Sequence, residues 1–387
     1  MRRAVACVTT RDATTAPARV FGGARCALQS ASQRGWPKAV LAACVLTLFS
    51  GCSALSYSLS YYWQAFAGQM EVRRLSRPVE EVLADSATGE DLRRRLAYAA
   101  RARDFAVREL GLPDNRSYRL YADVQRPYVV WNVFAAPELS LELKTQCFPV
   151  AGCVPYRGYF AKDAADAHAA ELRKSGDDVS VGGVPAYSTL GWFDDPLLNT
   201  FIRFPELEIA RLIFHELAHQ VAYVKDDASF NESYAVAVEE EGMRRWIKGN
   251  ATPEQVARFE AYRQRQQELI ALLMRGRERL GVAYASGDDV AAQRRAKAAA
   301  IDALKADYAQ RKATWNLSQA EQRSYDEWFY RDLNNARLGS VAVYTQHVAA
   351  FARVIAQSGG DMQTFHARVK QLAGLPRTER LVRLAAP

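Results

Sequence analysis

The sequence predicts an α+β fold in which a sheet-containing part comes before a mainly helical part. Segments with alternating or β-rich character lie before residue 200, namely YRLYADV, YVVWNVF, LSLELKTQCF and the stretch that ends in VPAYSTLGWF. After residue 200 apolar residues recur at helical spacing, and the longest such stretch covers residues 253–312. Strands that are followed by a run of helices, without regular alternation, indicate an α+β architecture.

Composition and charge describe a folded globular protein. The 387 residues are 49% hydrophobic and 24% charged. The formal net charge is +8, but residues 1–51 hold seven basic residues and one acidic residue, which leaves 44 basic and 42 acidic residues elsewhere. A remainder of +2 excludes the strongly basic surface that nucleic-acid binding requires, so no nucleic-acid partner is expected.

The N-terminus predicts export followed by lipid anchoring. Arg34 and Lys38 precede an apolar run over residues 39–49, which is too short to span a bilayer but suits a signal peptide. The run ends in LFSGC, which resembles a bacterial lipobox with Phe49 in place of the usual leucine. Cys52 would then be acylated, and Ser53 resembles the outer-membrane signal of Gram-negative bacteria. The alternative is an ordinary signal peptide with an incidental cysteine.

Three expectations follow from the prediction of export and lipid anchoring. Residues 1–51 form a presequence, of which 1–33 lack signal-peptide features and indicate a start codon further downstream. The mature protein faces the periplasm of a bacterial envelope. Cys147 and Cys153 are the two cysteines left after Cys52, and in that oxidising compartment they are expected to form a disulfide.

The remaining elements follow in chain order. Residues 52–75 predict the anchor and a first helix, whose Tyr61, Trp63 and Phe66 are expected in the core, with a position at the membrane interface as the alternative. Amphipathic helices over residues 76–111 stop at a Gly-Leu-Pro sequence, and a short helix is expected over residues 163–174. Residues 253–312 predict a long antiparallel helical hairpin around a Ser-Gly-Asp turn. Its charged outer faces indicate solvated surface, with a partner-binding arm as the alternative.

The chemistry is concentrated in HELAH, residues 215–219, which holds two of the five histidines. Pro205, the acidic residues that follow it and the apolar spacing predict a helix through this segment. His215 and His219 then lie four residues apart on one face, so that both rings can bind one metal ion beside Glu216. The sequence thus predicts one zinc ion per chain and a general base at Glu216. Two hydrogen-bonded core histidines are the alternative.

A catalytic zinc of this kind needs a third protein ligand. A second helix is expected to open near Phe230 and to run toward Gly249, packed antiparallel to the first. Glu232 and Glu239 lie on the same face of that helix, about 10 Å apart, so only one of them can reach the metal. Spacing alone leaves either glutamate possible as the third ligand.

Motifs in this chain resemble those of known zinc aminopeptidases. HELAHQ followed by NESYA is similar to the HELAHQ and NEGFA pattern of the gluzincin clan, which implies Glu232 as the ligand. The separation is shorter here, and Glu239 matches thermolysin-like spacing without the preceding asparagine. CFPVAGCVPYRGYF, AYSTLGWFDDP, FNESYA and NNARL further resemble a family of bacterial lipoproteins described as aminopeptidases. The resemblance covers nearly the whole mature chain and implies a gluzincin-like peptidase domain over residues 76–387.

Further roles are expected around this centre. Tyr344 is the candidate donor to the oxyanion, with His347 on the same helical face, and a core or surface tyrosine is the alternative. AYSTLGWF has the position of the edge strand that aligns substrate backbones, with ordinary sheet as the alternative. The G-x-M-E-N segment that binds the substrate's α-ammonium in the aminopeptidases is absent, so its substitutes would be Asp194, Asp195, Glu206 or Glu239.

The function expected from these residues is hydrolysis of peptide bonds by a membrane-anchored zinc peptidase acting on peptides or proteins, with aminopeptidase action favoured. A zinc endopeptidase acting on envelope proteins is the first alternative. A lipoprotein scaffold with a structural metal, which binds a partner through residues 253–312, is the second.

Overall fold

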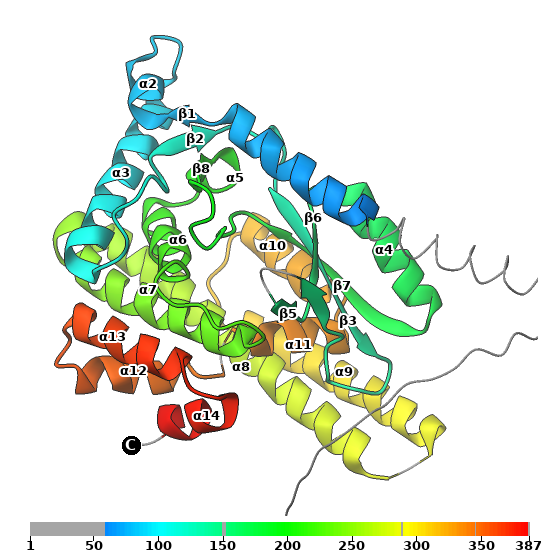
Figure 1. Cartoon of the computed structure of the whole chain (residues 1–387). Coiled ribbons are helices and arrows are strands. Elements are labelled where there is room, and N and C mark those ends of the chain that lie inside the picture. Colours follow the sequence, from blue (N-terminus) through cyan, green and yellow to red (C-terminus); the bar gives the residue numbers. More distant parts are fainter. Residues whose placement is uncertain (1–58, 149–151, 288, 345, 386–387) are drawn as a thin grey trace, which may run out of the picture. The chain divides into compact units, whose positions relative to one another are not determined.

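The computed structural model describes residues 59–148, 152–287, 289–344 and 346–385 (Figure 1). The predicted presequence 1–51 and the predicted lipid-bearing Cys52 lie outside the described residues. The described residues belong to one compact unit of mixed α+β architecture, so the α+β part of the predicted fold class is confirmed. Among the described residues, no helix combines the length and the apolar character needed to cross a membrane.

Helices open the described chain. A helix over residues 59–75 is followed by α2 (Val79–Ala84) and α3 (Glu90–Leu110), which ends at Gly111 with a left-handed φ of +63°. The expectation that Trp63 and Phe66 lie in the core is wrong, because their exposed fractions are 69% and 57%. The ring of Phe160 packs directly on Gly68, which turns the face that bears Trp63 and Phe66 outward.

A three-stranded antiparallel sheet holds the centre of the N-terminal part. Its strand order is β6 (Arg157–Tyr159), β3 (Val130–Pro137) and β7 (Asp177–Val184). Alternate side chains of a strand face opposite sides of its sheet. Trp131, Val133 and Ala135 therefore pack on α4 (Lys162–Lys174), while Phe134 and Ala136 pack on Ala336 of α11 (Asn335–Val343). The predicted helix over 163–174 is present as α4.

Short strands complete the β structure. β1 (Arg77–Pro78), β2 (Leu120–Ala122) and β8 (Leu197–Leu198) form a second sheet. β4 (Gln146–Phe148) and β5 (Gly152–Val154) pair as a hairpin, in which a disulfide joins Cys147 to Cys153 directly across the two strands.

One predicted strand segment keeps strand structure only at its end, as β4, and a second has none. Residues 138–145, most of LSLELKTQCF, run as irregular chain, because Leu141 packs on the helical cluster of residues 253–341 and Leu143 packs on Gly339. Residues 186–193 are also irregular, so the expected edge strand at AYSTLGWF is wrong. The Thr189 amide donates to the buried Asp195 carboxylate over 3.1 Å, and this contact bends the segment away from a strand.

The rest of the chain is helical. After α5 (Asn199–Ile202) come α6 (Glu206–Ala218), α7 (Ala228–Asn250), α8 (Pro253–Ala285), α9 (Val290–Lys312) and α10 (Gln319–Tyr330). Following α11, the chain ends with α12 (Val348–Gln357), α13 (Met362–Ala373) and α14 (Arg377–Ala385). Helices α8 and α9 lie against each other as the predicted hairpin and share buried Leu273, Leu280 and Leu304.

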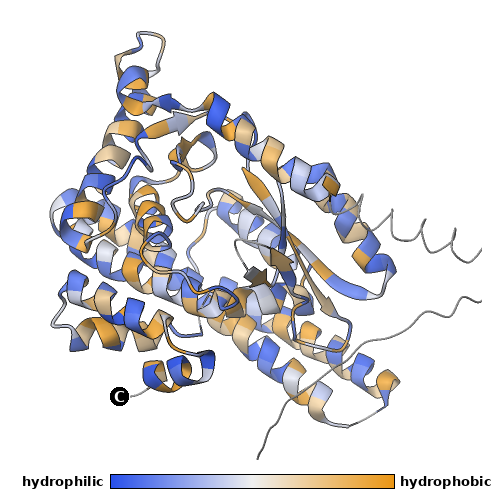
Figure 2. Ribbon diagram, viewed as in Figure 1, coloured by the Kyte–Doolittle hydropathy of each residue, from blue (hydrophilic) through white to orange (hydrophobic). Residues whose placement is uncertain are grey.

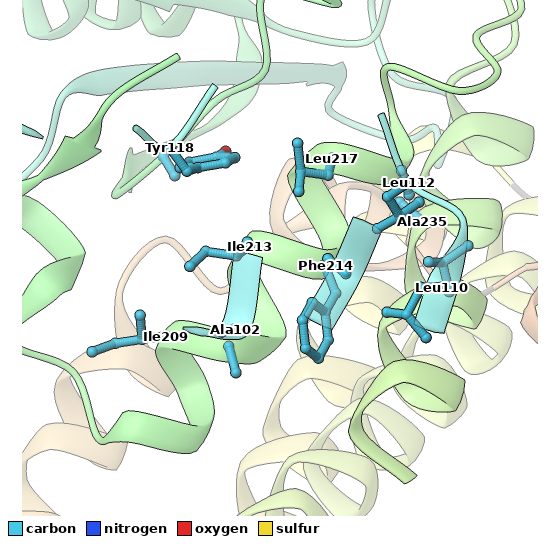
Figure 3. Close-up of a cluster of buried hydrophobic side chains, with 14 of the residues drawn as sticks. Ala102, Leu110, Leu112, Tyr118, Ile209, Ile213, Phe214, Leu217 and Ala235 are labelled. Carbon is cyan, nitrogen blue, oxygen red and sulfur yellow. The ribbon is translucent and has the colours of Figure 1, made fainter. Parts of the chain in front are cut away.

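The largest hydrophobic core lies where α3, α6 and α7 meet. These helices carry apolar and polar residues along their length (Figure 2), and the apolar ones converge. Ile213, Phe214 and Leu217 of α6 belong to this core together with Leu110 at the end of α3 and Ala235 of α7 (Figure 3). This packing fixes α6 against α7.

Close approach in this core gives a stability prediction. A methyl group at Gly242 of α7 would lie 2.7 Å from Leu110 and Phe214 side-chain carbons, whereas nothing lies within 4 Å at Gly249 of the same helix. We expect Gly242→Ala to lower the free energy of unfolding by about 1–3 kcal/mol, because the packed neighbours must shift. Gly249→Ala should be neutral or stabilise by up to about 1 kcal/mol, because alanine is the better helix former. Urea denaturation measures both, and equal effects would contradict the close packing.

Candidate metal centre

Helix α6 and His219, the residue that caps its C-terminus, present two histidines on one face. Glu206 and Glu208 lie in its first turn, where negative charge stabilises a helix N-terminus. His215 and His219 are both buried, and their ring centroids lie 4.9 Å apart. The Nε2 atoms of the two rings are 3.3 Å apart, so both nitrogens face the same point.

Helix α7 supplies a carboxylate to that point. Its N-terminus is fixed by Asn231, whose side chain accepts a hydrogen bond from the Val224 amide over 2.7 Å and donates one to the Val224 carbonyl over 2.8 Å. This pair of bonds holds the turn between α6 and α7. Glu232, the next residue, places Oε2 3.4 Å from His215 Nε2 and 3.7 Å from His219 Nε2.

The three side chains fit one metal ion. Their donor atoms lie within 4.8 Å of one another. A tetrahedral ion with bonds of about 2.0–2.1 Å requires its donor atoms to be about 3.3 Å apart. The separations of 3.3, 3.4 and 3.7 Å lie close to that value. His215, His219 and Glu232 can therefore hold a metal with a fourth position left for a small ligand.

Glu239, the rival ligand, lies behind His215 instead. Its Oε2 is 3.0 Å from His215 Nδ1, on the side of the ring away from the metal position. Arg211 donates to both carboxylate oxygens over 3.0 and 2.8 Å. Burial alone would raise the pKa of Glu239, but the charge of Arg211 and the contact with His215 lower it to about 2. The ionised Glu239 orients the ring of His215, as carboxylates behind metal-binding histidines do.

The charges of the centre suit a cation. Burial lowers the pKa of His219 to about 4, which leaves its imidazole neutral as metal binding requires. Burial alone would also lower the pKa of His215, but hydrogen bonds to Glu232 and Glu239 raise it to about 10. A divalent cation between His215 and Glu232 would take the place of that proton.

Glu216 is the remaining acid of the HELAH segment. It is 8% exposed and lies in the wall of the cavity beside the histidines. Burial, with a smaller contribution from the charges of Glu232 and Asp195, raises the pKa of its carboxyl to about 7 against the opposing charge of His215. A carboxyl group with a pKa near neutrality can both accept and return a proton.

A cavity of about 810 Å³ opens over these residues. Its walls come from α6 and α7, from the sheet strands β3 and β6, and from residues 184–190. The helix over residues 59–75 contributes Tyr61 and Ala65, and α8 contributes Arg263, Gln267 and Ile270. The hairpin of residues 253–312 is therefore part of the site.

Comparison with protein families identifies the chain. Residues 60–384 match the model of a family described as "Putative aminopeptidase". The chain belongs to this family. The matched range spans the elements around the cavity and includes the α8–α9 hairpin. No curated protein and no solved structure gives a match.

Tyrosines surround the metal position in this member of the aminopeptidase family. Tyr344 lines the cavity, and the charge of Glu232 together with burial raises its pKa well above the usual value. Tyr156 and Tyr223, which sequence reasoning missed, line the same cavity, and burial followed by the charge of Glu232 raises the pKa of each. No periodic signal marks them, since Tyr156 lies in a connection between two short strands.

The expected pairing of Tyr344 with His347 is wrong. Helix α11 ends at Val343 and α12 begins at Val348, so the two residues do not share a helical face. The His347 amide donates to Ser233 Oγ over 3.0 Å. His347 is the residue that caps the N-terminus of α12.

Three of the four acids that were considered as substitutes for the ammonium-binding glutamate lie elsewhere. Asp194 pairs with Arg116 at 3.6 Å, Glu206 accepts from Gln255, and Asp195 accepts from Thr189 and Gln220. The fourth, Glu239, is paired with Arg211 and His215. Besides the acids already discussed, Glu240 also lines the cavity in the described chain. Its carboxylate pairs with Arg263 over 3.1 Å.

Asp195 gives a pH prediction. Burial raises the pKa of its carboxyl to about 6 from the ordinary 3.8, so the folded state binds this proton more tightly than the unfolded state. Its contribution to stability is therefore greatest at low pH and falls as the pH rises through this range. Relative to Asp195→Asn, the native chain should lose up to about 3 kcal/mol of unfolding free energy between pH 4 and pH 6. Denaturation at several pH values tests this, and a constant difference would contradict it.

Glu239 gives a prediction on metal affinity. Replacing it by glutamine removes the charge that orients His215, so we expect metal affinity to fall about 10- to 100-fold. Glu240→Gln, which changes the adjacent carboxylate that faces Arg263, is the matched control and should leave affinity unchanged. Competition with a chelator measures both variants, and thermal melting checks that each is folded. Equal affinities would assign Glu239 no part in the centre.

Proposed function

We propose that the chain is a zinc-dependent peptidase of the bacterial cell envelope. The observation that carries this proposal is the convergence of His215 Nε2, His219 Nε2 and Glu232 Oε2 on one point beside Glu216. Two nitrogen donors and one carboxylate with an open fourth position form the donor set of zinc peptidases. Membership of the aminopeptidase family supports a peptide as substrate.

The chemistry divides between the metal and the chain. Zinc bound at these ligands would lower the pKa of a coordinated water toward about 7 and polarise the scissile carbonyl. Glu216 accepts the proton of the attacking water and returns it to the leaving amine, a role that its pKa of about 7 suits. Glu239 and Arg211 keep His215 in place throughout.

Tyr344 supplies the hydrogen bond to the developing oxyanion in this proposal. Its support is that Tyr344 and Glu232 line the same cavity, where the charge of Glu232 together with burial raises the pKa of the phenol well above its usual value. We expect Tyr344→Phe to lower kcat about 100-fold with KM little changed, because the bond forms mainly in the transition state. Tyr156→Phe is the matched comparison in the same cavity, and steady-state kinetics of both variants tests the assignment. A larger loss in Tyr156→Phe would move the role to that residue.

The cavity favours apolar substrate side chains beside the scissile bond. Tyr61, Phe148, Val154, Phe160 and Ile270 contribute apolar surface to its lining. Aminopeptidase action follows from the family, and a zinc endopeptidase is the second candidate. The observation that favours the second is the pairing of Glu240 and Glu239 with arginines, which leaves neither carboxylate open to a substrate ammonium group.

Anchoring through acylated Cys52 and a periplasm-facing position, with the outer membrane favoured, are part of the proposal. They rest on the presequence pattern of residues 34–53. A scaffold that binds a protein partner through residues 253–312 remains an alternative, and the contribution of α8 to the cavity favours the enzymatic role.

The decisive variant is Glu216→Gln. It keeps the shape and burial of the side chain but cannot take a proton, so we expect hydrolysis to fall by at least about 10³-fold with zinc content unchanged. Glu232→Ala should lose both zinc and hydrolysis. Metal analysis and release of fluorescent product from peptides with bulky apolar residues are the measurements. Full hydrolysis by Glu216→Gln would contradict the proposed mechanism.

The same assay separates the two kinds of peptidase. A free N-terminus is required for aminopeptidase action, so N-acetylated peptides should remain intact while their unblocked forms are cleaved. Cleavage of both forms would instead favour the endopeptidase. Zinc binding without any cleavage, together with partner capture that survives Glu216→Gln, would favour the scaffold.

A further inference from the structure

The helix over residues 59–75 carries apolar side chains on a face that nothing in the described chain covers. Leu59, Tyr62, Trp63 and Phe66 follow one another at the spacing of one helical face, and their exposed fractions are 63%, 45%, 69% and 57%. We call these four residues the aromatic stripe. A helix that is apolar on both faces is normally buried on both, so the stripe indicates a partner surface.

The charge pattern of this helix identifies the chemistry of the partner. Residues 53–70 contain no Asp, Glu, Lys or Arg. Exposed Arg73 and Arg74 follow at the other end of the helix, while Glu71 is neutralised by Arg126 over 2.8 Å. An uncharged face with tryptophan and tyrosine, next to exposed arginines, is typical of helices that lie in the interface of an anionic bilayer.

Chain length points to the same partner. Cys52, the proposed lipid-bearing residue, is seven residues before Leu59, and even a fully extended chain of that length reaches about 25 Å. A lipid on Cys52 would therefore hold the stripe within reach of the membrane surface. Figure 1 draws the helix (blue) along the upper edge of the view.

We propose that the aromatic stripe docks on the surface of an anionic lipid bilayer, as a second membrane contact independent of the acylated cysteine. The rings of Trp63 and Tyr62 lie at the headgroup level, and Arg73 and Arg74 face lipid phosphates. Tyr61 on the opposite face of the helix lines the catalytic cavity, so docking places one wall of the cavity beside the lipid surface. The enzyme is thereby held in one orientation.

The test uses residues 58–387, the compact unit, which lacks Cys52 and so isolates the stripe. The probe is vesicles of phosphatidylethanolamine and phosphatidylglycerol in a 3:1 ratio. We expect the unit to sediment with them and Trp63→Ser/Phe66→Ser to bind about 10-fold or more weakly. Val282→Ser/Val382→Ser is the matched control, because these side chains are 69% and 70% exposed elsewhere, and it should bind as the parent does.

A fluorescence measurement keeps the test open if the double variant does not fold. Vesicles should shift the tryptophan emission of the parent to shorter wavelength, and Trp63→Phe should bind while losing most of that shift. Absence of vesicle binding, or binding and emission unaffected by the stripe variants, would overturn the proposal. A dimer in vesicle-free solution that the double variant abolishes would overturn it in favour of a second copy. Zinc content and hydrolysis of soluble peptides should stay unchanged in these variants, which separates this test from that of the proposed function.

Discussion

The close antiparallel packing of α6 and α7 is the constraint on which the centre depends. Glu232 and Glu239, two turns apart on α7, reach the two ring nitrogens of His215 at 3.4 and 3.0 Å. One carboxylate completes the metal ligands and the other holds the ring. This arrangement requires the helices to stay in register, and the absence of a side chain at Gly242 allows the approach. Asn231 fixes the same register from the turn. Stability and chemistry thus share one contact surface.

Elements far from α6 in the sequence enclose the site. The helix over 59–75, the sheet strands and α8 all contribute to the cavity above the histidines. The disulfide-closed hairpin adds Phe148 and Val154 from its two strands. The hairpin of residues 253–312, whose charge indicated solvated surface, therefore forms one wall of the site through part of α8. The geometry supports a peptidase whose substrate would lie in this cavity, between the sheet strands and α8.

Local spacing explains what the sequence could predict. His215, Glu216 and His219 lie on one helix, so their mutual geometry follows from the helical repeat alone. The choice of Glu232 as the third ligand required the resemblance to the gluzincin pattern, because the position of this residue depends on the turn that Asn231 closes. Tyr156 and the inward face of α8 could not be predicted, since their contacts join residues that are distant in the sequence and carry no periodic pattern. The irregular path of residues 186–193 depends on Asp195, and alternation of side chains does not reveal such contacts.

The most direct test of the central claim is the position of the metal itself. Anomalous diffraction at the zinc absorption edge, from crystals of the zinc-loaded protein, would locate it. The account predicts one peak about 2.0–2.2 Å from His215 Nε2, His219 Nε2 and a Glu232 oxygen, with His215 Nδ1 still against Glu239. No peak at this position, or a peak coordinated by Glu239 instead of Glu232, would contradict it.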